Sequence, residues 1–237
     1  MKKVLELPGE LIGRFISRPN RFLATVELDG GEVVEVHVHD PGRLKEILRP
    51  NSRVLLKRAD KEGRRTKYDL LAGEVDGIWV FVHSGYHRDI STYLLQKGVV
   101  DGIGRPSTLH PEYRYGKSRM DFMLEVGGEM MLVEVKGCTL ARSGVALFPD
   151  APTVRGRRHL EELIRAVKEG MRAAVIFLTF RPDSTCFLPN GETDPDFERT
   201  FWRAVDVGVE VYPILLSYDG WWINHLGSLP LCTTPSE

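Results

Sequence analysis

Long apolar runs are missing from this sequence. The longest, from Ala173 to Phe180, is far shorter than the roughly 18 residues that a membrane-spanning helix needs. The first ten residues mix lysines with glutamates and contain no apolar stretch of the kind that marks a signal peptide. We therefore expect no membrane association and a cytoplasmic location.

Cysteine is also scarce. The three cysteines, Cys138, Cys186 and Cys232, are odd in number, and their spacings match neither a disulfide framework nor a zinc site. We predict that the chain contains neither, which agrees with a cytoplasmic protein.

An excess of charge of one sign is absent, since the formal net charge is −1. This excludes a uniformly basic, histone-like protein but leaves local patches open. Hydrophobic residues make up 42% and charged residues 27% of the chain, so a folded globular protein is expected. One basic patch is present, because residues 53–67 hold seven basic side chains against two acidic ones, a local net charge of +5. By itself, such a run is typical of a solvated hairpin.

The 237 residues are enough for two domains, and the pattern changes after residue 84. Up to that point, short apolar or alternating stretches are separated by turn residues, as in a small β-barrel. A short helix is expected from Asp40 to Leu48. This is the pattern of an OB-fold, a barrel that commonly binds single-stranded nucleic acid. The predicted strands span residues 11–17, 21–28, 32–39, 53–58, 67–75 and 78–82.

Beyond residue 84, strands alternate with helices, which is typical of an α/β layer sandwich. Helices are expected at 86–97, 153–168 and 196–205, and strands within 112–136 and at 173–180 and 209–216. The predicted fold class is therefore a two-domain α+β protein. An OB-like barrel occupies residues 1–84, and an α/β domain occupies residues 85–237.

The segment from Arg119 to Lys136 predicts a β-hairpin that carries charged side chains. Gly127-Gly128 between two apolar runs is a two-residue turn signal. In the resulting register Val126 faces Glu129, and counting back along both strands places Asp121 opposite Glu134. Lys136 lies on the same face because side chains on a strand repeat every two residues.

Two carboxylates buried opposite each other need a cation or a proton. Mg²⁺ or Mn²⁺ fits this need, since such ions bind one or two carboxylates and leave positions for water and phosphate oxygens. A lysine nearby would stabilise the charge that develops during phosphodiester hydrolysis. We therefore consider Asp121, Glu134 and Lys136 catalytic candidates. The alternative is a buried salt bridge between Lys136 and one of the carboxylates.

Several further side chains are candidates for contacts with nucleic acid. Arg155 and His159 lie within one helical turn near a helix start, where they would meet a phosphate or simply form a solvated face. In the barrel we expect phosphate contacts from Arg18, Arg21 and Arg43.

Three aromatic side chains of the barrel are ambiguous. Phe22 is either a platform for a stacked base or, as we prefer, a core residue. His37 and His39 point the same way on one strand, but no third ligand stands at a telling spacing. We therefore interpret the two histidines as barrel-lining or exposed side chains rather than as a metal site.

With these residues in place, the chain resembles the sugar fermentation stimulation protein family. The likeness rests on Arg18–Ala24, His37–Leu44, Ser118–Leu124 with Val133–Lys136, and Phe148–Leu160, which follow one another in order along most of the chain.

The resemblance implies an N-terminal OB-like domain and a C-terminal domain similar to PD-(D/E)XK nucleases. The acidic pair and the lysine of that motif match Asp121, Glu134 and Lys136, and the backbone carbonyl of Val135 would be a further metal ligand. Such nucleases often add an acidic residue from the first helix. Here the candidates are Asp89 on the predicted helix and Glu112 on a strand, and Glu112 is equally consistent with an exposed carboxylate.

The family is known chiefly for DNA-binding proteins linked to sugar metabolism, which leaves catalysis open. We predict a DNA-binding protein with a divalent-metal-dependent nuclease centre. The alternative is a non-catalytic DNA-binding regulator with a degenerate centre. Arg119 completes the predicted nucleic-acid contacts. The expected partner is DNA, with single strands as one alternative, and a homodimer is left open.

Overall fold

The structure is a computed structural model that describes residues 1–59 and 63–232. Asp60, Lys61 and Glu62 of the basic patch lie outside the described residues. Elsewhere in that patch, Arg53 pairs with Glu74 at 2.7 Å and Arg58 with Glu10 at 3.7 Å. Much of the local charge is therefore paired on the surface of the hairpin.

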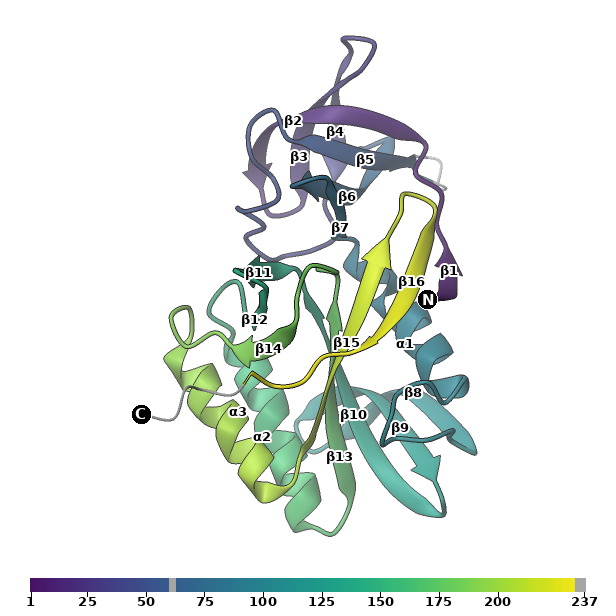
Figure 1. The fold of residues 1–237 in the computed structure, drawn as a ribbon, viewed down its shortest axis with the longest axis vertical. Helices are drawn as coiled ribbons and strands as arrows, with labels where there is room; N and C mark the ends of the chain where they lie inside the picture. Colours follow the sequence, from purple (N-terminus) through teal and green to yellow (C-terminus); the bar gives the residue numbers. More distant parts are fainter. Residues whose placement is uncertain (60–62, 233–237) are drawn as a thin grey trace.

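The N-terminal part is a barrel, drawn at the top of Figure 1. Its sheet has the order β4-β3-β2-β5-β6-β7, and a parallel pairing of β4 with β6 closes the ring. The five strands of the ring, β2 to β6, have the OB topology, which confirms the predicted barrel, and β7 extends the sheet beyond β6. The strands are β2 (Leu11–Asn20), β3 (Leu23–Leu28), β4 (Val33–His37), β5 (Arg53–Arg58), β6 (Tyr68–Val75) and β7 (Ile78–Phe81).

The helix predicted from Asp40 to Leu48 is wrong, because the segment forms turns. Leu44 adopts a left-handed φ of 52°, which a helix does not tolerate. The backbone N–H groups of Arg43 and Leu44 donate to the Asp150 carboxylate from the second domain. The Leu44 N–H, which a helix beginning at Asp40 would have bonded to the Asp40 carbonyl, is thus taken by a long-range partner.

The second part is built on a mixed seven-stranded sheet with the order β1-β16-β15-β13-β10-β9-β8. β10, β13 and β15 are parallel neighbours, and the remaining pairs are antiparallel. A small sheet, β11-β12-β14, lies beside it. The strands are β1 (Lys2–Glu6), β8 (Thr108–Tyr115), β9 (Ser118–Val126), β10 (Glu129–Cys138), β11 (Leu140–Arg142), β12 (Val145–Phe148), β13 (Arg172–Thr179), β14 (Cys186–Pro189), β15 (Glu210–Tyr218) and β16 (Trp222–Ser228).

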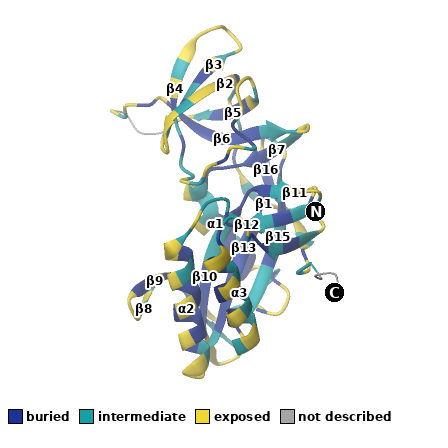
Figure 2. Cartoon of the chain, turned by 90° about the vertical axis from the view of Figure 1, so that its left-hand side faces the viewer, coloured by how far each residue is buried: buried dark blue, intermediate teal, exposed yellow. Residues whose placement is uncertain are grey.

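Helices cover both faces of this sheet (Figure 1). A short 3₁₀ turn, η1 (Ser84–Tyr86), leads into α1 (His87–Gln96), which packs on one face, while α2 (Val154–Lys168) and α3 (Pro195–Val207) cover the other. Figure 2 shows the central strands buried and the outer faces of α2 and α3 exposed, as expected for amphipathic helices. The central strand β10 therefore has α1 on one face and α2 on the other.

The core on the α1 side continues into the barrel, so the two parts share apolar packing. Phe81 at the end of β7 lies 5.2 Å from the Phe180 ring and 5.3 Å from the Tyr218 ring. The predicted boundary placed residues 1–10 in the barrel, whereas β1 pairs with β16 in the large sheet. None of the helices in the described ranges is long and apolar enough to cross a membrane.

The prediction that the chain contains no disulfide is wrong, because Cys186 is bonded to Cys232. After β16 the chain returns along β14. Phe187 donates its N–H to the carbonyl of Pro230, and Cys232 donates its N–H to that of Phe187. These backbone contacts bring together two cysteines that are 46 residues apart. Their sequence spacing carried no signal of this contact.

Candidate metal and nucleic-acid site

The β9–β10 hairpin has the register that the Gly127-Gly128 turn predicts. Both glycines adopt positive φ values, 61° and 87°, which residues with a side chain rarely adopt. Val126 pairs with Glu129, and the ladder continues to Phe122 and Val133. The pairing ends there, one position before Asp121 and Glu134. The two strands therefore separate at the residues that carry the charges.

Asp121 lies in the opening between the strands. Its Oδ2 accepts a hydrogen bond of 2.7 Å from the backbone N–H of Val135. Its side chain lines a cavity of about 420 Å³ on the α1 side, together with His87 and Asp89. Burial, with the nearby charge of Glu134, raises the pKa of Asp121 to about 6. A carboxyl group in this state is readily stabilised by a cation.

Glu134 lies on the other side of β10, beneath α2, and only 2% of its surface is exposed. Its Oε1 accepts hydrogen bonds from Lys136 Nζ and from His159 Nδ1. Burial alone would raise the pKa of Glu134, but Lys136 and His159 outweigh it and hold the pKa below its usual range. Its Oε2 is buried and has no hydrogen-bond partner among the described residues.

The prediction of one shared face is therefore only partly met. Glu134 and Lys136 face α2, while Asp121 opens toward α1. Asp121 still feels the charges of Glu134, Lys136 and His159. The salt bridge weighed as the alternative is present, but it occupies only one of the two Glu134 oxygens.

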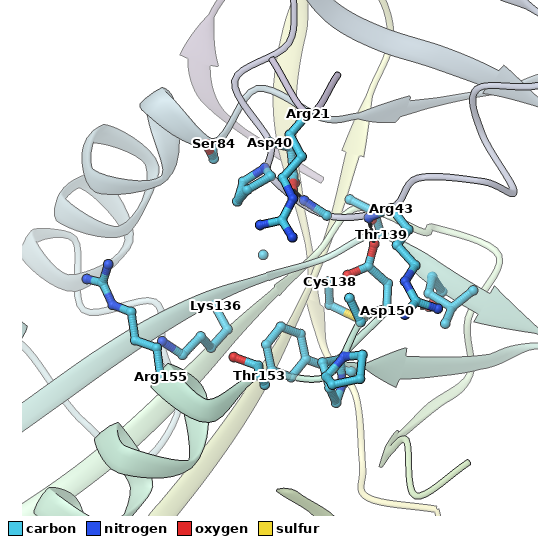
Figure 3. Close-up of a pocket in the computed structure, with 18 of the residues that line it drawn as sticks. Arg21, Asp40, Arg43, Ser84, Lys136, Cys138, Thr139, Asp150, Thr153 and Arg155 are labelled. Atoms are coloured by element: carbon cyan, nitrogen blue, oxygen red, sulfur yellow. Dashed lines mark hydrogen bonds between the residues drawn. The ribbon is translucent and has the colours of Figure 1, made fainter. Parts of the chain in front are cut away.

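A cleft of about 800 Å³ runs between the barrel and the second domain beside this centre. Figure 3 shows Arg21 and Arg43 on the barrel side, and Lys136 and Arg155 across the cleft from them. Within the described ranges, neither the Arg21 nor the Arg43 guanidinium has an ion-pair partner. Unpaired guanidinium groups on a concave surface suit phosphate oxygens.

Arg18 also lines the cleft, but its guanidinium is used internally. It donates to the backbone carbonyls of Gly42 at 2.7 Å, Asp40 at 2.8 Å, Arg21 at 2.7 Å and Arg43 at 3.0 Å. It therefore holds the 40–43 loop, and with it Arg43, against the strand. A direct phosphate contact by Arg18 stays a prediction.

The two acidic candidates for a fourth ligand differ in their surroundings. Glu112 is exposed, and its carboxylate is paired with Arg88 and, at 3.5 Å, with Arg119. Asp89, in the first turn of α1, lines the same cavity as Asp121. The structure therefore favours Asp89 over Glu112 as the further acid of this centre. Arg119 is exposed and remains a predicted nucleic-acid contact.

His87 is a residue that the sequence did not single out. It lines both the cleft and the smaller cavity. Its ring stacks on Phe180 at 5.6 Å and fills the space beside Gly137, where a Cβ atom would lie 2.3 Å from the ring. Burial, helped by Lys136, lowers the pKa of His87 to about 4. In the sequence, Gly137 directly after Lys136 was the only hint that another group approaches β10 closely at this point.

The assignment of Phe22 to the core is wrong, because 53% of its surface is exposed. It follows Arg21 at the rim of the barrel, and its ring is 16° from parallel with that of His37. An exposed aromatic ring next to an unpaired arginine suits a stacked base.

His39 lies near two further possible metal ligands that the sequence did not reveal. Ligand atoms of His39, Asp69 and His83 all lie within 4.8 Å of one another. However, Arg64 binds both Asp69 oxygens, at 2.7 and 3.0 Å. The His39 and His83 rings stack face to face at 3.6 Å, so their nitrogen lone pairs do not converge. His39 and Arg64 therefore occupy both Asp69 oxygens, while His83 Nδ1 is buried without a hydrogen-bond partner among the described residues.

The barrel and the helix-flanked sheet define a class, an OB-like domain followed by a restriction-endonuclease-like α/β domain. Comparison with family models agrees. The SfsA N-terminal OB domain matches residues 16–82, and the sugar fermentation stimulation protein RE domain matches residues 85–220. The chain belongs to the sugar fermentation stimulation protein (SfsA) family.

Relatives cover nearly the whole chain. The sugar fermentation stimulation protein homolog of Methanococcoides burtonii is 40% identical, over 97% of this chain and 95% of that protein. The homolog of Thermotoga neapolitana is 45% identical, over 96% and 98%. The structure of Pyrococcus furiosus SfsA in complex with Ca²⁺ matches with a TM-score of 0.89 at 27% identity, over 98% of this chain and all 100% of that one.

Proposed function

We propose that this protein binds DNA in the cleft between its two domains and hydrolyses phosphodiester bonds with a divalent cation, Mg²⁺ or Mn²⁺. The observation that carries the proposal is the Oε2 atom of Glu134, buried without a partner, beside a second buried carboxyl group, Asp121. An unpaired buried carboxylate oxygen is costly, and a bound cation removes that cost.

The residues present fit a hard divalent cation. Asp121, Glu134 Oε2 and the carbonyl of Val135 would supply oxygen ligands, and Asp89 lines the same cavity as Asp121. When bound, the cation would polarise the phosphate and lower the pKa of a water molecule. A related protein, Pyrococcus furiosus SfsA, was solved with Ca²⁺, which uses the same class of ligands.

The chain's own side chains supply the remaining functions. Lys136 places a positive charge beside Glu134, where it stabilises negative charge on a reacting phosphate. Arg21, Arg43 and Arg155 hold flanking phosphates along the cleft. Arg119 extends the contact outside it.

Single-stranded DNA is the favoured form of the substrate. A cleft of about 800 Å³ has room for a few unpaired nucleotides, and OB-like barrels commonly bind single strands in such basic grooves. The exposed Phe22 ring at the rim is available to stack on one of their bases.

One observation favours the non-catalytic alternative, a DNA-binding regulator with a degenerate centre. The Lys136 ammonium group is engaged by Glu134 and lies 3.2 Å from His159 Nδ1, so it is partly withdrawn from the cleft. Binding without cleavage is the outcome that this alternative predicts.

The test is cleavage of end-labelled single-stranded and duplex DNA by the purified protein, with Mn²⁺ or with chelator. We expect Mn²⁺-dependent cleavage that is lost in Asp121→Ala and Lys136→Ala. Lys168→Ala, an exposed lysine at the far end of α2, is the matched control and should cleave normally. Binding without any cleavage would support the regulator instead, and cleavage that persists in both variants would place the active site elsewhere.

A further inference from the structure

His159 was expected to contact phosphate, but its side chain is only 2% exposed and does not line the cleft. It lies in the second turn of α2, whose start is fixed by Thr153, which accepts a hydrogen bond of 3.0 Å from Gly156 N–H. The ring is thereby held over β10. The ring contacts Glu134, Lys136 and Arg155 instead of the cleft.

The contacts of His159 assign its tautomer. Arg155 Nε donates to His159 Nε2 at 3.4 Å, and a guanidinium group has no acceptor, so Nε2 carries a lone pair. In a neutral imidazole the proton then lies on Nδ1. This Nδ1–H donates to Glu134 Oε1.

Lys136 donates to the same oxygen. Its Nζ lies 3.2 Å from His159 Nδ1, and because both are donors they do not bond to each other. Both hydrogen bonds converge on Oε1, one from β10 itself and one from α2. Oε2 receives neither bond.

We propose that His159 is a positioning residue that, together with Lys136, holds Glu134 by Oε1 so that Glu134 binds the divalent cation through Oε2 alone. The proposal rests on the proposed metal centre. Two donors on one oxygen prevent the carboxylate from rotating, so the remaining oxygen keeps a fixed direction. Partners of metal ligands commonly orient them in this way.

The test measures Mn²⁺ binding by calorimetry in three variants. His159→Leu removes the donor, and we expect Mn²⁺ affinity to fall by roughly 10-fold to 100-fold, as is usual when the partner of a ligand is lost. His159→Asn places an amide N–H where Nδ1–H was, and we expect it to retain most of the affinity. Arg158→Ala, an exposed neighbour on α2, should bind like the wild type.

Two further measurements do not depend on activity. Thermal unfolding in chelator shows whether each variant folds, and the rise in melting temperature on adding Mn²⁺ reports binding independently. Long-range ¹H–¹⁵N spectra of histidine-labelled wild-type protein should show His159 protonated at Nδ1. This measurement needs no variant to fold.

Three outcomes overturn the proposal: equal Mn²⁺ affinity in His159→Leu and wild type, an Asn variant as weak as the Leu variant, or a proton on Nε2 rather than Nδ1. Wild-type protein that binds no Mn²⁺ would refute the metal centre and this inference together. Wild-type binding that is unchanged in His159→Leu would refute only the positioning role.

Discussion

Two buried carboxylates of this protein, Asp69 in the barrel and Glu134 in the α/β domain, are each surrounded by nitrogen donors. Asp69 has both oxygens occupied: Arg64 binds Oδ1 and Oδ2, and His39 adds a bond of 3.0 Å to Oδ1. Glu134 receives both of its bonds on Oε1. Similar partners therefore leave one carboxylate closed and the other with a free coordinating oxygen.

The difference shows what separates a structural ion pair from a candidate metal ligand. A closed carboxylate has a partner on each oxygen, so a cation would have to displace a guanidinium group. An open carboxylate gains from a cation, because a buried oxygen without a partner costs free energy. The proximity of His39, Asp69 and His83 is therefore not enough to make them a candidate metal site.

The largest expected effect separates the two carboxylates by metal binding. Glu134→Ala should weaken Mn²⁺ binding by at least about 100-fold, since it removes a ligand rather than the partner of a ligand. Asp69→Ala should leave Mn²⁺ affinity unchanged. Calorimetric titration of both proteins measures this, and equal losses in the two variants would contradict the distinction.

The second prediction concerns stability, where the Asp69 site rather than the metal site should show the effect. Asp69→Ala leaves Arg64 without its carboxylate and should lower the free energy of unfolding by about 2 kcal/mol, less than for a fully buried pair because the Arg64 side chain is 26% exposed. Urea denaturation in chelator measures it. Asp206→Ala, on the exposed face of α3, is the control. A loss no greater than that of the control would show that the closed network contributes little.

The two regions should also respond to pH with opposite signs. The pKa of Asp121 is raised from 3.8 to about 6, so the folded state holds its proton more tightly, and the stability this contributes disappears as pH rises from about 4 through 6. Burial, and to a lesser extent the charge of His39, lowers the pKa of His83 from 6.5 to about 3. The stability that neutral His83 contributes therefore disappears as pH falls through that range.

In chelator, Asp121→Asn should therefore be more stable than wild type at pH 7 but not at pH 4. His83→Phe, which keeps a stacked ring that cannot ionise, should gain on wild type at pH 4 rather than at pH 7. Each change should be on the order of 2 kcal/mol. Urea denaturation at the two pH values measures it, and gains at the same pH in both variants would contradict the assignments.

The smallest expected effect concerns arginine side chains in the two regions and their contribution to DNA binding. Arg64 is bound by Asp69, whereas Arg21 and Arg43 face the cleft. Arg21→Ala and Arg43→Ala should each weaken DNA binding and reduce its salt-dependence slope by about one unit. Fluorescence anisotropy across a salt series measures this. Arg49→Ala, an exposed arginine outside the cleft, should not change the slope.

Local patterns in the sequence were sufficient for most of the elements. The six barrel strands were predicted within a few residues, because alternating apolar residues and Gly-rich turns report a strand directly. The Gly127-Gly128 turn fixed the hairpin register and so located Asp121 and Glu134. The helix from Asp40 to Leu48 was wrong because Leu44 adopts a left-handed φ and its N–H binds Asp150, more than a hundred residues away.

The sequence by itself determined most strands and helices of both domains and the acidic hairpin with Lys136, because each depends on residues close together in the chain. The tertiary structure decided how the charges are used. It brought His159 from α2 to Glu134, Asp89 from α1 to the cavity of Asp121, and Cys232 to Cys186. These contacts depend on the packing of distant elements, and so does the oxygen of Glu134 that is left without a partner.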